Sequence, residues 1–233
     1  AFDMDAEKWW GYNSIDESFH AFSKDFVFVE SIQLEIPDLR MIDLFKVHNN
    51  RYILLAGVNA QNNGAIWIYD IANSNYSSYE PDGLALSLSF VDEDTLASLM
   101  SSSTGVHIEL YNVSAQAVEG TIDVITNFAI TLGVAPDGKI YYASSRGIYQ
   151  VNEDDHKNVG YIDNIPENAY NEAMMKIFPL SDKCYVWVNG NGYVECVEYT
   201  QGNKTNSALV VDSSFYVPAA MSLYEESGNR VEL

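Results

Sequence analysis

Few residues of this chain could carry chemistry, and the most specific motif match is a phosphate-binding loop. The run from Gly133 to Lys139 fits the first seven positions of that loop. The loop requires Ser or Thr next, for magnesium, and a helix whose N-terminus faces the phosphates. Here Ile140 follows and the pattern continues as a β-strand. We therefore interpret the motif as a turn between strands.

Metal ligands are not gathered into a recognisable set. The acidic clusters Asp92–Asp94 and Glu153–Asp155 lack the glycine that turns a calcium loop sharply, so we interpret both as solvated turns, with weak calcium binding as the alternative. None of the histidines has a second His or a Cys at helical or hairpin spacing; they are His20, His48, His107 and His156. We predict no metal site and no cofactor.

Two cysteines, Cys184 and Cys196, flank the turn Asn189–Gly192. A three-residue loop centred on Gly190 would place them opposite each other, since 184 + 196 = 2 × 190, and would bring a disulfide within reach. A two-residue loop would shift the register and separate them. A disulfide and two half-buried thiols both stay open, and zinc is not predicted because no His lies near the pair.

The elements that must position any site repeat along the chain at one spacing. Arg51, Thr95, Lys139 and Lys183 each follow a polar turn and open an apolar run, with separations of 95 − 51 = 44, 139 − 95 = 44 and 183 − 139 = 44. A fixed period in the low forties with several strands per period is typical of a β-propeller, with one blade per repeat. The sequence thus predicts a single all-β propeller domain over residues 1–233.

Four complete four-stranded blades are expected at about 37–80, 81–124, 125–168 and 169–212. At the ends, 26–36 matches an outer strand and 219–233 matches an inner strand with the start of a second. We expect these two pieces to pair and close a fifth blade, which removes open sheet edges, with residues 1–25 as an N-terminal extension. The alternative is a segment of a longer chain.

The net charge of the chain limits which classes of partner it can bind, and its N-terminus bears on where it is located. Lys plus Arg number 12 against 33 Asp plus Glu, a net charge of −21, which repels phosphate backbones and anionic lipid, so nucleic acid is not an expected partner. No signal peptide or membrane-spanning stretch is present, and the chain opens with Ala1 rather than Met. We expect a secretion signal to have been removed and place the protein outside the cell, at the cell surface, in the periplasm or on a lipid anchor.

The stretch Ala135–Asn152 resembles the blade core of bacterial β-propeller repeat proteins. The whole chain, acidic and rich in Asn and Tyr, is also similar to propeller regions of secreted proteins, lipoproteins and solute-binding-associated proteins of gut anaerobes. The resemblance implies a propeller fold and supplies no catalytic motif. The Gly-His and Trp-Asp pairs of WD40 repeats and the double glycines of kelch repeats are absent.

The predicted function is a non-enzymatic extracellular binding or interaction module. No catalytic residue is predicted, because glycoside cleavage needs two carboxylates and the inner strands offer Asp43 and little else. A glycan-active hydrolase or lyase using the central channel is one alternative, and a structural spacer of a larger secreted protein is another.

The predicted ligand-binding face carries the hairpin loops and the segments that join one blade to the next. Amides and aromatic rings on this face suit a glycan, a peptide or another protein domain. The candidate residues are Asn62, Asn63, Arg146, Asn168, Tyr170, Asn191 and Tyr216.

Overall fold

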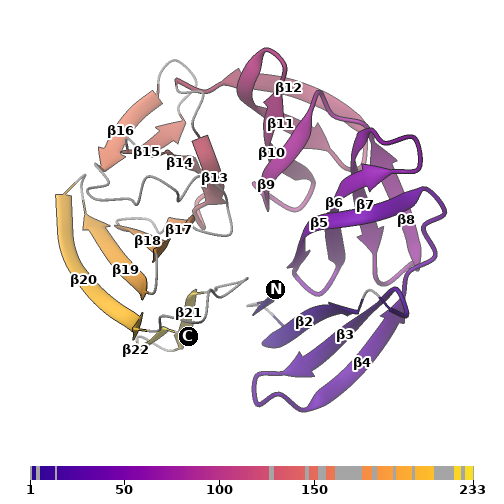
Figure 1. Cartoon of the computed structure of the whole chain (residues 1–233), viewed down its shortest axis with the longest axis horizontal. Coiled ribbons are helices and arrows are strands. Elements are labelled where there is room, and N and C mark those ends of the chain that lie inside the picture. Colours follow the sequence, from indigo (N-terminus) through magenta and orange to yellow (C-terminus); the bar gives the residue numbers. More distant parts are fainter. Residues whose placement is uncertain are drawn as a thin grey trace. The chain divides into compact units, whose positions relative to one another are not determined.

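The computed structural model describes residues 2–3, 6–13, 15–125, 129–144, 147–151, 156–160, 175–179, 183–190, 193–200, 203–212, 223–226 and 229–232. Every regular element in these ranges is a β-strand, which confirms the all-β class (Figure 1). Over the same ranges, no helix has the length and apolarity that a membrane span requires.

The N-terminal residues build a complete sheet. It contains β1 (Phe2–Asp3), β2 (Lys8–Asn13), β3 (Ser18–Ser23) and β4 (Phe28–Gln33), paired antiparallel in that order (Figure 1). The predicted extension 1–25 therefore supplies strands, and β4 pairs with β3. The split blade of 26–36 with 219–233 stays a prediction, and among the described residues β21 (Leu223–Glu226) and β22 (Asn229–Glu232) form a two-stranded sheet.

Four more sheets share the same four-stranded order. The second contains β5 (Leu39–His48), β6 (Tyr52–Asn59), β7 (Gly64–Asp70) and β8 (Asn75–Tyr79). The third contains β9 (Leu84–Phe90), β10 (Thr95–Ser102), β11 (Gly105–Asn112) and β12 (Ala117–Asp123). The fourth contains β13 (Ala129–Val134), β14 (Ile140–Ser144), β15 (Gly147–Val151) and β16 (His156–Gly160). The fifth contains β17 (Met175–Pro179), β18 (Lys183–Gly190), β19 (Tyr193–Thr200) and β20 (Asn203–Asp212).

The spacing of the second strands extends the sequence repeat to the N-terminus. These strands begin at Lys8, Tyr52, Thr95, Ile140 and Lys183, with separations of 52 − 8 = 44, 95 − 52 = 43, 140 − 95 = 45 and 183 − 140 = 43. Each repeat thus supplies one antiparallel sheet of four strands.

Turn residues set where the strands begin. Asn49 and Asn50 follow β5 with φ angles of 51° and 50°, in the left-handed region that Asn tolerates better than most residues. Gly138 has a φ of 81°, and its N–H donates to the Ala135 carbonyl at 2.9 Å. Such tight turns fix the register of the strands that they join.

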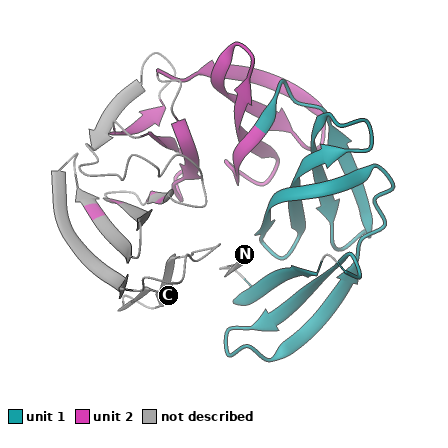
Figure 2. Cartoon of the chain, in the orientation of Figure 1, with its two compact units in different colours: residues 1–84, 224–231, 233 teal, residues 85–223, 232 magenta. Residues whose placement is uncertain are grey.

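The first compact unit comprises residues 1–84, 224–231 and 233 (Figure 2). Its core lies between the first two sheets, where Trp10 and Phe19 pack with Leu55 and Trp67, all of them buried. The Phe19 ring meets the Phe45 ring edge-on, with centroids 5.0 Å apart. One face of the first sheet is therefore covered by the second sheet.

The second compact unit comprises residues 85–223 and 232 (Figure 2). Leu99 and Ile108 of the third sheet pack in one core with Leu132 and Tyr142 of the fourth. Gly133 in β13 lets β17 approach closely, because a Cβ at this position would lie 2.7 Å from Pro179 Cδ. Sheets in this unit therefore also stack face against face.

Candidate functional site

Loops of the first compact unit are tied together by hydrogen bonds. The Leu34 N–H donates to the Glu17 carbonyl at 3.2 Å, which joins the β4–β5 link to the β2–β3 hairpin. The Ala60 N–H donates to the Asp38 carbonyl at 2.9 Å, which joins the same link to the β6–β7 hairpin. We call residues 15–17, 34–38, 60–63 and 80–83 the loop rim. These bonds give neighbouring sheets one continuous loop surface within this unit.

A pocket of about 290 Å³ lies at the loop rim. Leu34 and Ile36 are buried in its wall, whereas Met41 is 50% exposed. Glu17 and Arg40 are exposed and add one carboxylate and one guanidinium. Apolar residues beside a phenol, a carboxylate and a guanidinium suit an apolar side chain held by flanking polar contacts. The lining residues are Tyr12, Glu17, Leu34, Ile36, Leu39, Arg40, Met41 and Ile42.

Tyr12 on β2 is half-buried, whereas the charged residues Glu17 and Arg40 of the pocket are exposed. Burial raises the pKa of Tyr12, and the nearby carboxylates of Glu17 and Asp16 raise it further. The phenol therefore stays neutral at physiological pH and can both donate and accept a hydrogen bond. A ligand in the pocket can use it in either role.

The β6–β7 hairpin of the loop rim is held by Asn59, which is 5% exposed. Asn59 Oδ1 accepts the Gln61 N–H at 3.0 Å and the Asn63 N–H at 2.9 Å, and its Nδ2 donates to Glu80 Oε1 at 2.6 Å. Asn63 Nδ2 donates to the other oxygen of Glu80 at 3.1 Å. The Glu80 carboxylate thus clamps the hairpin through two amides.

The two candidate residues on this hairpin differ in what they offer to a ligand. Asn62 is exposed with a φ of 67°, and Asn63 is exposed but uses its side chain on Glu80. Sequence reasoning missed Asn59 and Glu80. The signal for Asn59 was its place at the start of the run Asn59–Gly64, where an Asx turn is expected.

Asp16, Ser18 and His20 form a cluster that resembles a catalytic triad in composition only. Asp16 Oδ1 accepts the Ser18 hydroxyl at 2.6 Å, and His20 Nε2 lies 2.9 Å from Ser18 Oγ and 3.8 Å from Asp16 Oδ2. A triad needs the imidazole between Ser and Asp, one on each ring nitrogen. Here one nitrogen faces both, and the Ser18 hydroxyl lowers the pKa of Asp16 by donating to it. The cluster closes a hairpin and does not activate Ser18.

The phosphate-loop match folds as the turn that the sequence indicates. The Ala135 N–H donates to the Lys139 carbonyl at 2.9 Å, and the Lys139 ammonium pairs with the Asp137 carboxylate. This contact lowers the pKa of Asp137 and raises that of Lys139. Strand β14 begins at Ile140, so a strand follows this turn where a phosphate-binding loop has a helix.

The acidic cluster Asp92–Asp94 caps a turn. Asp92 Oδ1 accepts the N–H groups of Asp94 and Thr95, both at 2.8 Å, and these bonds lower the pKa of Asp92. Asp94 Oδ1 accepts the Ser114 hydroxyl at 2.6 Å. The second cluster, Glu153–Asp155, lies outside the described residues. Among the residues that the structure describes, no group of three or more His, Cys, Asp or Glu side chains could hold a metal ion.

One buried polar pair lies in the third sheet. His107 and Glu109 are 8% and 5% exposed, and His107 Nε2 lies 3.3 Å from Glu109 Oε1. They are two residues apart on β11, so their side chains share one face of the strand. Sequence reasoning missed this pair, for which the alternation His-x-Glu in a strand was the signal.

The cysteine register differs from the one that a disulfide requires. Gly190 pairs with Tyr193, so two residues connect β18 to β19, and Cys184 lies opposite Tyr199 while Cys196 lies opposite Trp187. The cysteines are thus offset by three positions, roughly 10 Å along the strand, which exceeds disulfide reach. The two-residue loop, which separates them, is the alternative that holds.

The remaining candidate residues lie outside the part of the chain that the structure describes. They are Arg146, Asn168, Tyr170, Asn191 and Tyr216. Of the seven predicted ligand-binding residues, the structure therefore describes Asn62 and Asn63. Both lie on the β6–β7 hairpin, which the Ala60 N–H joins to the Asp38 carbonyl, and neither lines the pocket.

Comparisons with known proteins identify the fold. No protein-family model and no curated protein matches the sequence. The WD40 repeats of RRP9 match with a TM-score of 0.58 and 12% identity over 88% of this chain, which spans 60% of that chain's length. A protein of Bacteroides fragilis NCTC 9343 that is assigned as exported matches with a TM-score of 0.53 and 11% identity, over 88% of this chain and 69% of that one. At these identities the likeness supports a propeller-repeat type of fold.

Proposed function

We propose that the chain is a non-enzymatic interaction module of the propeller-repeat type, in which each four-stranded sheet serves as one blade. It binds a partner protein by taking an apolar side chain into the pocket at the loop rim. The pocket carries the proposal, because its volume of about 290 Å³ suits one large side chain and six of its eight lining residues are apolar or aromatic.

The architecture of the first unit supports this role. Buried Leu34 and Ile36 form a rigid wall, and exposed Met41 can close over an inserted side chain because its thioether is flexible. Glu17 and Arg40 supply charges of both signs beside the wall, where they can orient the partner backbone. Loops on a rigid scaffold are the usual place for such recognition.

The proposed setting is extracellular or at the cell surface. One structural neighbour is assigned as exported, and the sequence resembles propeller regions of secreted proteins and lipoproteins of gut anaerobes. The net charge of −21 suits a soluble surface that excludes nucleic acid.

The test is a selection from a phage-displayed library of random dodecapeptides on the purified chain. Met41→Asp places a charge in the pocket wall. Val118→Asp is the matched control, because Val118 is 48% exposed and lies on β12 in the other unit. Selected peptides should share an aromatic or aliphatic residue, and should bind Met41→Asp at least ~10-fold more weakly, the usual scale of an anchor contact.

The binding of those peptides to Val118→Asp should equal that of the wild type. Equal affinity for both variants would place the peptides elsewhere and refute the pocket as the site. A glycan array run on the same protein tests for a glycan ligand. Saturable glycan binding, with no peptide selected, would refute a peptide-binding pocket and favour a glycan-binding function.

A further inference from the structure

The outer strand of the first sheet differs from its counterparts in the next two sheets. Residues Phe26–Val29 form a run of exposed apolar side chains, which are 69%, 64%, 57% and 45% exposed in order. The corresponding run at β8 is Ser74-Asn-Tyr-Ser, and the one at β12 is Gln116-Ala-Val-Glu. Large apolar side chains exposed in sequence mark an interaction surface.

Phe26 also differs from the residues at the same position of the next two sheets. It has a φ of 60°, which a bulky residue rarely adopts, and its ring stacks on Trp9 with centroids 5.5 Å apart and planes 14° apart. Ser74 and Gln116 hold the comparable left-handed turn positions before β8 and β12, with φ angles of 50° and 52°. An exposed aromatic thus stands where the next two sheets carry polar side chains.

Strand β4 is the last strand of its sheet, so one of its edges faces away from β3. An edge strand can pair with a strand from another chain. Its six residues offer about 20 Å of backbone for such pairing.

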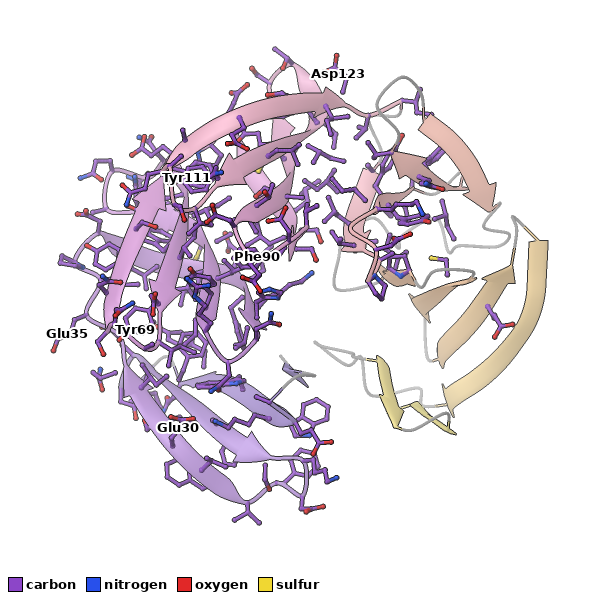
Figure 3. All side chains as sticks on the ribbon, turned by 180° about the vertical axis from the view of Figure 1, so that it is seen from behind. Glu30, Glu35, Tyr69, Phe90, Tyr111 and Asp123 are labelled. Atoms are coloured by element: carbon purple, nitrogen blue, oxygen red, sulfur yellow. The ribbon has the colours of Figure 1, made fainter. Side chains whose placement is uncertain are left out.

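A groove of about 690 Å³ runs beside β4, within the first compact unit. Ile32 of β4 and Ile71 of the β7–β8 turn supply apolar wall, and Tyr69 and Tyr76 supply aromatic rings. Glu30 and Glu35 line it as well, and Figure 3 labels Glu30 on the first sheet and Glu35 near Tyr69. Among the described residues that line the groove there is no Lys or Arg.

Charge decides which kind of segment fits. The Lys8 ammonium donates a hydrogen bond to the Glu30 carboxylate at 2.7 Å, so the Lys8 charge partly compensates that of Glu30. Glu35 is exposed. Carboxylates beside tyrosine rings attract Lys and Arg side chains by ion pairing and cation–π contact. An acidic peptide would meet these carboxylates and a chain with a net charge of −21.

We propose that this groove binds an extended, basic segment of a partner protein, which adds as a strand to the free edge of β4. Alternate side chains of the segment face the groove, where Lys or Arg meets Glu35 and the exposed Tyr76. At its far end, the segment covers Phe28 and Val29. No residue lines both this groove and the loop-rim pocket, although Glu35 lies in the chain between the pocket residues Leu34 and Ile36. The test uses a different peptide and reads protection of β4, so its outcome is distinct from that of the pocket.

The probe is an octapeptide of alternating Lys and Val, with an octapeptide of alternating Glu and Val as the reverse-charge control. Affinity is measured by fluorescence anisotropy on wild type, Glu35→Lys and Glu93→Lys. The last variant makes the same charge change on an exposed turn of the other unit. Amide hydrogen exchange of β4 and β12 is measured with and without peptide.

The Lys-Val peptide should bind and the Glu-Val peptide should not. Glu35→Lys should weaken binding about threefold to tenfold, because it removes one exposed ion pair and adds one repulsion, while Glu93→Lys leaves affinity unchanged. Amides of Phe28–Gln33 should gain protection, and those of Ala117–Asp123 should not.

Three results would overturn the proposal. The first is an equal loss of affinity in both charge variants, which would indicate attraction to net charge only. The second is binding without protection of β4. The third is association with phosphatidylcholine vesicles that Phe26→Ser abolishes, which would assign the apolar run to a lipid surface.

Discussion

Gly133→Ala should destabilise the second compact unit, because the added methyl group has no room. A Cβ at Gly133 would lie 2.7 Å from Pro179 Cδ and 3.0 Å from the carbonyl oxygen of Ile177. All three residues are buried, and Pro179 and Ile177 belong to β17 of the next sheet. The strand would have to move, and neither a proline ring nor a backbone carbonyl can rotate away.

The size of the effect follows from two opposing terms. Overpacking a close contact costs about 1–3 kcal/mol, while alanine recovers about 0.5–1 kcal/mol over glycine in a strand. The net loss of unfolding free energy is therefore up to about 2.5 kcal/mol. For a chain of this length that corresponds to a Tm lower by up to about 10 °C.

Gly120→Ala is the matched control in the same unit. Gly120 lies in β12, and a Cβ there would meet nothing within 4 Å, so this variant should be as stable as the wild type or more stable by up to about 1 kcal/mol. Thermal and urea unfolding followed by circular dichroism compare the three proteins. If Gly133→Ala unfolds together with Gly120→Ala, the fourth and fifth sheets do not pack at the stated distance.

Three further predictions concern the hairpins and one buried phenol. Asn59→Ala should lower the free energy of unfolding by about 1–3 kcal/mol, because the groups that hydrogen-bond to the buried Asn59 amide would lose their partner. Urea unfolding measures the loss. Backbone N–H donors hold the pKa of Asp92 below its usual range, so its stabilisation is full above the unfolded pKa of about 3.9 and is lost as the pH falls through the lower folded pKa. The stability gap between wild type and Asp92→Ala should therefore shrink below about pH 4 in urea melts. Burial raises the pKa of Tyr142 to about 12, so wild type and Tyr142→Phe should give the same tyrosinate absorbance until the pH approaches that value, and a difference near pH 10 would contradict the burial.

The strands of the second to fifth sheets could be predicted from sequence because a local signal marks each one. Polar turns such as 92–94 mark the ends of apolar runs. The observed start of β10 at Thr95 is the predicted one. The N-terminal sheet was missed although the same period reaches it, since 51 − 44 = 7 and β2 begins at Lys8. The Trp9-Trp10-Gly11-Tyr12 run lacks the β-branched residues that mark the other second strands, and the strand signal is correspondingly weak.

The site was harder to predict because long-range packing creates it. The pocket joins Tyr12 and Glu17 to residues 34–42 across two sheets, and no local pattern encodes that contact. The β18–β19 register stayed open at the level of sequence for a different reason. The run Asn189–Gly192 permits several loop lengths, and one residue more or less moves every pair of the hairpin.

The role of the loop rim in partner binding can be measured directly by amide hydrogen exchange on the whole chain, saturated with a dodecapeptide from the selection. Binding in the pocket predicts slower exchange in residues 15–18 and 34–42, with no change in β12 or β14. Protection confined to other parts of the chain, with residues 34–42 exchanging as in the unbound protein, would contradict the proposed function.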